Sequence, residues 1–191
     1  MFFLILPALL LTCAIDFCLF PIQGLTQGTE KEKLSHFDRL AEEATLLNKR
    51  GQADKVIILL EPLKDTPKND SALFFNELGV AYRQQGRLSE SIRAYQSALT
   101  RNPENPVIMK NLGDVLVLNK EYPRAIEQYQ KTLQANPRFH QAHYGLGVAL
   151  YQIQKYQEAL EAFDTVLKLN SRDERAKNFR EATLKKLKGE K

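Results

Sequence analysis

The sequence predicts an all-α fold, an α-solenoid of stacked helical pairs. Gly79, Gly113 and Gly147 recur 34 residues apart, and a fixed period of this length is typical of repeated helical units. The same period relates Leu78, Leu112 and Leu146, then Ser91, Ala125 and Ala159, and then Tyr95, Tyr129 and Phe163. The 191 residues are 43% hydrophobic and 26% charged, which is an ordinary globular composition. The repeats therefore account for most of the chain.

Residues 1–28 predict a signal peptide or an N-terminal membrane anchor. The stretch 1–20 is almost wholly apolar, which suits a signal-peptide core and is short for a membrane span. Asp16 interrupts it, and no Lys or Arg precedes Lys31, so the usual positive n-region is missing. A cleaved signal is favoured, an uncleaved anchor is the main alternative, and lipidation at Cys13 is a weaker one. We expect the repeats to be exported, periplasmic or extracellular, or membrane-anchored outside the cytoplasm, rather than cytosolic.

Residues 37–71 are interpreted as a degenerate first repeat. Its first helix matches the large, small, large and turn positions at Leu40, Ala44, Leu47 and Gly51. Its second helix is expected to carry Val56, Leu60 and Leu63, with a kink at Pro62. Asn69-Asp70-Ser71 fits a glycosylation sequon, but we favour its role as a cap for the following helix.

Residues 72–105 form the clearest repeat. Its first helix presents one apolar face at Phe75, Leu78, Gly79 and Tyr82. Gly86 is placed to end that helix in a left-handed cap. The partner helix carries a stripe of Leu88, Ile92, Tyr95 and Leu99. Asn102-Pro103 ends it and Asn105-Pro106 begins the next helix, because proline suits a first helical turn and not an interior.

Residues 106–139 and 140–173 repeat this pattern, and residues 174–191 add a basic capping helix. The glycines, facing Ser or Ala on the partner helix, are expected to let the two helices approach closely. The aromatic series Tyr95, Tyr129 and Phe163 is expected to fill the seam towards the next repeat. The last helix, from Glu174 to Lys188, has an apolar side that would cover the end of the stack.

These motifs resemble the tetratricopeptide repeat family over roughly residues 37–188. The family pattern is met nearly in full at Phe75, Leu78, Gly79, Tyr82, Ser91, Tyr95, Ala98 and Pro103. The resemblance implies a right-handed superhelix with a concave groove, peptide or protein binding, and usually no catalysis. By analogy, the groove residues are Leu73, Asn76, Val80, Arg83, Val107, Lys110, Asp114, Val117, Gln141, Tyr144, Val148 and Tyr151.

Some family members bind acidic chaperone tails through a set of Lys, Asn, Asn, Lys and Arg residues. The corresponding positions here are Asn76, Val80, Asn111, Gln141 and Gly145. Only Asn111 matches, and the cations that would contact carboxylates are missing. Binding of such chaperone tails is therefore not expected.

No catalytic or cofactor motif emerges. His140 and His143 could reach one metal ion, but no further ligand lies nearby in sequence and a packed histidine is favoured. Gly145-Leu146-Gly147 lies inside a repeat helix and lacks the third glycine of a dinucleotide loop. We expect no metal, no cofactor, no small-molecule substrate and no enzymatic activity.

The net charge of +4 is carried by the last segment, where Lys185, Lys186 and Lys188 cluster. A solvated helix end is favoured over contact with lipid or nucleic acid, and nucleic-acid binding is not expected. The leading hypothesis is a non-enzymatic scaffold that binds a peptide or protein segment of an unidentified partner. The alternatives are an assembly factor of an envelope or secretion complex, or a regulatory subunit of an enzyme encoded elsewhere.

Overall fold

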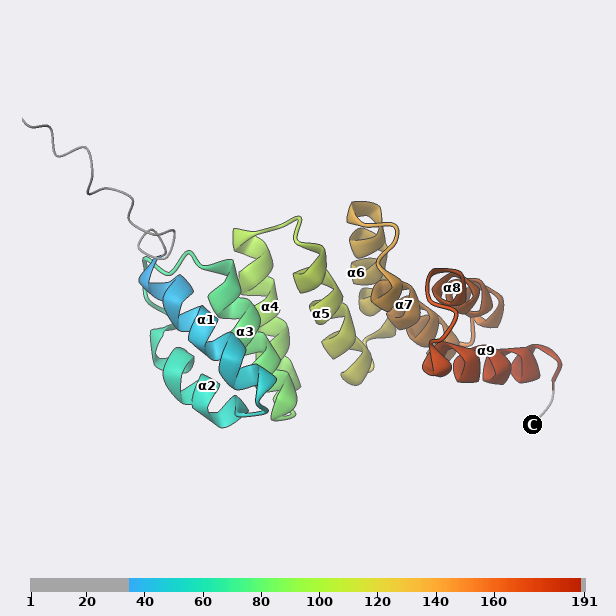
Figure 1. Cartoon of the computed structure of the whole chain (residues 1–191), viewed down its shortest axis with the longest axis horizontal. Coiled ribbons are helices and arrows are strands. Elements are labelled where there is room, and N and C mark those ends of the chain that lie inside the picture. The colour runs from blue at the N-terminus through green and yellow to red at the C-terminus, as the bar shows by residue number, and fades with distance from the viewer. Residues whose placement is uncertain (1–34, 190–191) are drawn as a thin grey trace, which may run out of the picture. The chain divides into compact units, whose positions relative to one another are not determined.

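The structure, a computed structural model, describes residues 35–189, and within that range every regular element is a helix (Figure 1). The helices are α1 (His36–Lys49), α2 (Ala53–Leu60), the short 3-10 helix η2 (Glu61–Leu63), α3 (Ala72–Gln84), α4 (Leu88–Arg101), α5 (Pro106–Leu118), α6 (Tyr122–Ala135), α7 (His140–Gln152), α8 (Tyr156–Leu169) and α9 (Glu174–Leu187). The predicted signal or anchor at 1–28 lies outside the described residues.

Each helix packs against the next one along the chain, and the odd-numbered helices also contact one another in order. α1 touches α3, α3 touches α5, α5 touches α7 and α7 touches α9. The odd helices therefore form one continuous layer and the even helices form a second layer beside it. This arrangement confirms the predicted α-solenoid of helix-turn-helix repeats.

Left-handed turns join the two helices of each pair. Gly51 and Gly86 have φ values of 70° and 72°, so the cap predicted at Gly86 is confirmed. The equivalent positions in the next two repeats are Lys120 and Gln154, which also have positive φ, at 61° and 64°. Side chains with a Cβ are strained in this conformation, so the turn geometry is imposed by the packing of the helices.

Side-chain caps fix the start of four odd helices, and in α1 the cap is Ser35, which accepts a hydrogen bond from the Asp38 amide. Ser71 accepts a hydrogen bond from the Phe74 amide at 3.1 Å, and Asn105 accepts from Val107 and Ile108. Asp173 accepts from the Ala176 amide at 3.1 Å. The capping interpretation of residues 69–71 is therefore confirmed at Ser71.

The sequence expectation at Pro62 was wrong in detail. α2 does not kink but ends at Leu60, and Glu61–Leu63 continue as a 3-10 turn with the proline in its first positions. Proline has no amide hydrogen to donate and its ring clashes with the preceding turn, so an α-helix stops before it.

Ring-against-glycine packing holds each helical pair together. A Cβ built on Gly79 would meet the Tyr95 ring at 2.8 Å, and one built on Gly147 would meet the Phe163 ring at 2.7 Å. The glycines therefore make room for an aromatic ring of the partner helix, as well as for close approach of the backbones. Ser91 shows that close approach, since its hydroxyl donates to the Gly79 carbonyl at 2.7 Å.

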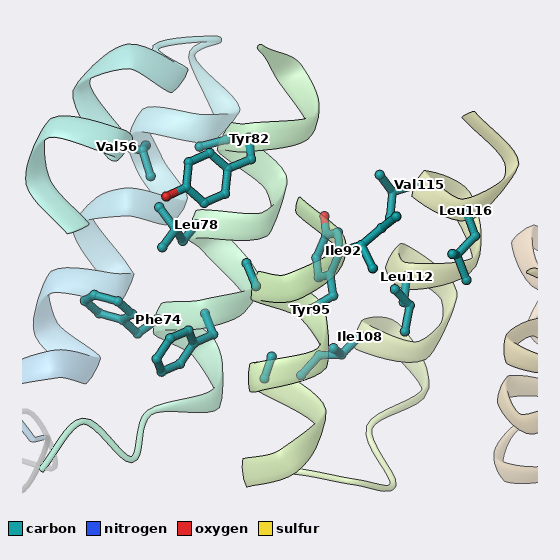
Figure 2. Close-up of a cluster of buried hydrophobic side chains, with 14 of the residues drawn as sticks. Val56, Phe74, Leu78, Tyr82, Ile92, Tyr95, Ile108, Leu112, Val115 and Leu116 are labelled. Carbon is teal, nitrogen blue, oxygen red and sulfur yellow. The ribbon is translucent and has the colours of Figure 1, made fainter. Parts of the chain in front are cut away.

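The buried side chains form two clusters, a large one that runs from α1 to α7 and a smaller one of Leu150, Ala159 and Phe163 in α7 and α8. Figure 2 shows side chains of α2, α3, α4 and α5 gathered in one cluster, with Val56 near Tyr82 and Ile108 near Tyr95. Tyr95 is fully buried. Burial of this apolar surface supplies the main stabilisation of the stack.

The last helix, α9, keeps the 34-residue register of the repeats. Ala176 and Thr183 are fully buried, as are Ala142 and Ala149 one repeat earlier. Phe179 stacks on Phe163 with ring centroids 5.5 Å apart. α9 is therefore the first helix of a fifth repeat that has no second helix within residues 35–189.

α9 differs from α7 at the positions that face the second helix of a repeat. Lys177, Arg180 and Glu181 occupy the positions that hold His143, Leu146 and Gly147 in the preceding repeat. In α7, Gly147 receives the Phe163 ring of the partner helix, whereas in α9 all three positions are polar and partly or fully exposed.

Candidate functional site

One cavity lies on the layer of odd helices, and we call it the inner cavity. It has a volume of about 290 Å³. Its lining comes from α3, α5, α7 and α9, together with Tyr129 of α6. The lining residues are Arg83, Lys110, Asp114, Val117, Leu118, Tyr129, Gln141, Tyr144, Gly145, Val148 and Arg175.

Seven of the twelve groove residues proposed from the sequence line this cavity. They are Arg83, Lys110, Asp114, Val117, Gln141, Tyr144 and Val148. The structure therefore brings together side chains from three repeats that are separated by up to 65 residues in sequence.

The remaining five lie elsewhere. Leu73 and Val107 are exposed in the first turns of α3 and α5, at 38% and 49%. Val80 and Tyr151 are half-buried and do not line the cavity. Asn76 is buried, with only 8% of its surface exposed.

The expected surface position of Asn76 is corrected by its hydrogen bonds. Its amide donates to Glu77 Oε1 at 3.0 Å, and its carbonyl oxygen accepts from Asn111 Nδ2 at 3.0 Å. Asn48 donates to the same Glu77 carboxylate at 2.8 Å. Buried polar groups need such partners, so Asn76 ties α3 to α5 instead of facing a ligand.

Asp114 is the one carboxylate in the cavity lining, and two side chains of the protein already hold it. Lys110 Nζ lies 2.9 Å from Oδ2, and the Tyr129 hydroxyl donates to Oδ1 at 2.8 Å. Burial raises the pKa of Tyr129, and the negative charge of Asp114 raises it further. The phenol therefore stays protonated and remains a donor to Asp114.

The guanidinium group of Arg83 has a hydrogen-bond donor that is unsatisfied within residues 35–189. Its Nε is buried and makes no hydrogen bond within the described residues. The fully buried Tyr95 hydroxyl is likewise without a hydrogen-bond partner there. Burial raises the pKa of Tyr95, while the nearby Arg83 charge acts in the opposite direction.

Arg175 brings a second guanidinium to the cavity from the first turn of α9. Its Cζ lies 4.8 Å from the centre of the Tyr144 ring, and its Nη2 lies 3.3 Å from Asp173. Tyr144 also meets Phe179 edge-on, with centroids 5.8 Å apart. The site is therefore built in part by α9, the last helix within residues 35–189.

Tyr151 and Tyr144 are partly covered because both pack on Phe179, and the Tyr151 and Phe179 centroids are 5.9 Å apart. Replacing these tyrosines would therefore disturb the attachment of α9 as well as any ligand contact.

The sequence reasoning missed Leu118, Tyr129, Gly145 and Arg175. Arg175 had a usable signal, because it lies 34 residues after Gln141 and so continues the register of groove positions. Tyr129 had none, since its repeat position predicted a packing role only. Its ring packs against Gly113 and Gly145 at once, and its hydroxyl emerges into the cavity.

His143, one of the two histidines considered above as metal ligands, packs within the fold. His143 is half-buried, and its Nε2 lies 2.9 Å from the Pro137 carbonyl oxygen. Across residues 35–189, no group of three or more His, Cys, Asp or Glu side chains could hold a metal ion. A search of the same residues for a helix long and apolar enough to cross a bilayer finds none.

The tetratricopeptide repeat family model matches residues 76–137 and 111–174. Among solved structures, the chain is similar to the first repeat domain of Spaghetti (RPAP3) bound to the HSP90 peptide SRMEEVD. That match has 26% identity and a TM-score of 0.61, and it covers 63% of this chain and 95% of that one. The corresponding domain of human RPAP3 matches at 26% identity, over 62% and 93% of the two chains, with a TM-score of 0.60.

MamA has the same fold, with a TM-score of 0.71 at 22% identity over 78% of this chain and 87% of that chain. Comparison with curated proteins finds no match. The two overlapping family matches together span more than half of the chain and coincide with α3 to α8. The chain belongs to the tetratricopeptide repeat family.

Proposed function

We propose that this protein is a non-enzymatic interaction scaffold whose inner cavity binds a segment of a partner protein. The observation that carries the proposal is the gathering of apolar and charged side chains from four successive odd helices around one cavity. Such a mixture suits a ligand that needs both apolar contact and oriented polar contact. A relative of similar fold was solved with a bound peptide, which supports the same mode of binding.

A binding role without catalysis is supported by the state of Asp114. Lys110 and Tyr129 already engage its carboxylate, so Asp114 is held as a structural anion. A carboxylate in this arrangement is poorly suited to act as a free base.

Selection from a random peptide display library against the full-length chain tests this function. Binding of the selected peptides is then measured by fluorescence anisotropy to wild type, to Val148→Glu in the cavity, and to Gln157→Glu on the exposed surface of α8. We expect Val148→Glu to weaken binding at least tenfold and Gln157→Glu to leave it unchanged. Thermal melting of both variants shows that the fold is retained.

The cavity assignment fails if the peptides bind wild type and Val148→Glu equally well, or if no library peptide binds the chain.

We also propose that the repeats act outside the cytoplasm, supported by the apolar segment at residues 1–20. Mass spectrometry of the chain purified from its native host would identify the mature N-terminus, and protease protection in intact cells would locate the repeats. Complete protection of the repeats by the cytoplasmic membrane contradicts the proposal.

A further inference from the structure

The inner cavity carries a surplus of positive charge. Lys110 and Asp114 form an ion pair at 2.9 Å and so balance each other. The two remaining charged groups in the lining are the guanidinium groups of Arg83 and Arg175. A ligand that fills the cavity therefore meets two arginines and a carboxylate that is already paired.

Arg83 is held in a position that calls for an external acceptor. Its side chain is half-buried, and its Nε has no hydrogen-bond partner within residues 35–189. Lys110 and Arg175 have acidic partners in the same range, whereas none of the ion pairs found there includes Arg83. Because Arg83 lines the cavity and has no anionic partner in that range, a carboxylate from a ligand would supply the missing ion pair.

Arg175 is the more accessible of the two arginines. Its side chain is 65% exposed, and its ion pair with Asp173 is long, at 3.3 Å. The ring of Tyr144 supports one face of the guanidinium, which leaves the planar edge available for a carboxylate.

An apolar surface lies between these two cations. Arg83 is on α3 and Arg175 is on α9, while α5 and α7 pack between those helices in the stack. α5 and α7 contribute Val117, Leu118 and Val148 to the lining. Leu118 is 55% exposed, so part of this surface is uncovered.

We propose that the inner cavity selects a segment in which two acidic side chains flank a bulky apolar one. One carboxylate pairs with Arg83, the apolar side chain packs on Val117, Leu118 and Val148, and the second carboxylate pairs with Arg175. This inference rests on the proposed peptide-binding function and adds the chemistry of the ligand. It relies on internal acidic side chains, so the peptide needs no free C-terminus.

The probes are capped synthetic peptides in which two Glu residues flank a Leu at several spacings, each paired with a version carrying Gln in place of Glu. Affinities are measured by fluorescence anisotropy with the full-length chain. We expect the best Glu peptide to bind about tenfold more tightly than its Gln version, a preference that shrinks as salt is raised.

Arginine variants locate the effect. Arg83→Gln should weaken the Glu peptide about tenfold and leave the Gln peptide nearly unchanged, and Arg83→Lys should restore part of the loss. Arg175→Gln should weaken the Glu peptide about threefold, because that arginine is more exposed. Arg93→Gln, on α4 beside a different cavity, is the matched control and should have no effect.

The inference is overturned if Glu and Gln peptides bind equally well, if Arg83→Gln weakens both equally, or if no Glu peptide binds. Its failure is distinguishable from failure of the proposed function. Suppose that the library peptides bind Val148→Glu more weakly than wild type but show no preference for acidic residues. The cavity would then remain the binding site, and only the proposed ligand chemistry would be rejected.

Discussion

The ring of Tyr129 lies against Gly113 so closely that a Cβ built on the glycine would meet Tyr129 Cε1 at 2.7 Å. The next repeat closes on the same ring through Gly145, which is closer still. One aromatic side chain is therefore enclosed by glycines of two successive repeats, and it also donates a hydrogen bond to Asp114 in the inner cavity.

Gly113→Ala should destabilise the fold by about 1–3 kcal/mol, because the added methyl forces the buried ring to shift. Urea unfolding followed by circular dichroism measures the change in the free energy of unfolding. Combining Gly113→Ala with Tyr129→Leu should show favourable coupling, since the smaller side chain relieves the clash. Strict additivity of the two changes would contradict the steric explanation.

Lys120→Gly and Gln154→Gly should each stabilise the protein by up to about 1 kcal/mol. Both residues have positive φ values, a conformation that costs a residue with a Cβ about 1–2 kcal/mol. Glycine removes this strain, but it loses more backbone entropy on folding, which offsets part of the stabilisation. Melting temperatures and urea midpoints check the prediction. Gly86→Ala, in the same turn of an earlier repeat, is the converse control and should destabilise.

Tyr95→Phe and Tyr129→Phe should differ in their effect on stability at neutral pH. The Tyr95 hydroxyl is buried without a hydrogen-bond partner within residues 35–189, so its removal should change stability by less than about 0.5 kcal/mol. Tyr129→Phe removes a donor to Asp114 and should cost about 1–2 kcal/mol. Chemical denaturation at pH 7 distinguishes the two variants.

The same tyrosines predict loss of stability in alkali. Burial raises the pKa of both phenols in the folded state, while in the unfolded chain they ionise near pH 10. Above about pH 10 the folded state therefore binds more protons than the unfolded state, so the free energy of unfolding falls as the pH rises. Tyr95→Phe should flatten this dependence, and an unchanged slope would show that Tyr95 does not contribute to it.

Phe179→Ala should release α9 from the stack. The ring contacts Phe163, Tyr144 and Tyr151, and its loss should cost about 2–4 kcal/mol. Hydrogen exchange should show faster exchange in α9 while α3 to α6 stay protected, because repeats contact only their neighbours. Lys177→Ala, on the exposed side of the same helix, should leave the exchange of α9 unchanged.

The repeat was predictable because its packing residues recur. Gly79 and Tyr95 occupy fixed places in the 34-residue period, and the structure places them in contact. The strained turns at Lys120 and Gln154 were not predicted, because neither position is a glycine. The sequence indicates them only through their register with Gly86.

The site was only partly predictable, because a helix position does not determine which neighbour a side chain meets. Asn76 has the same register as Lys110 and Tyr144, yet it is buried through hydrogen bonds to Glu77 and Asn111. The contact with Asn111 joins two helices, and neither contact follows a shared pattern in the sequence.

The unbroken register of α9 means that its side chains, and not the course of its backbone, decide whether a second helix packs on it. Lys177, Arg180 and Glu181 stand where the preceding repeat has His143, Leu146 and Gly147. A tandem duplication that restored apolar and small residues there could add a further unit without rebuilding the existing ones. A few substitutions on α9 would therefore suffice to receive a further helix, and none of them falls on a residue that lines the inner cavity.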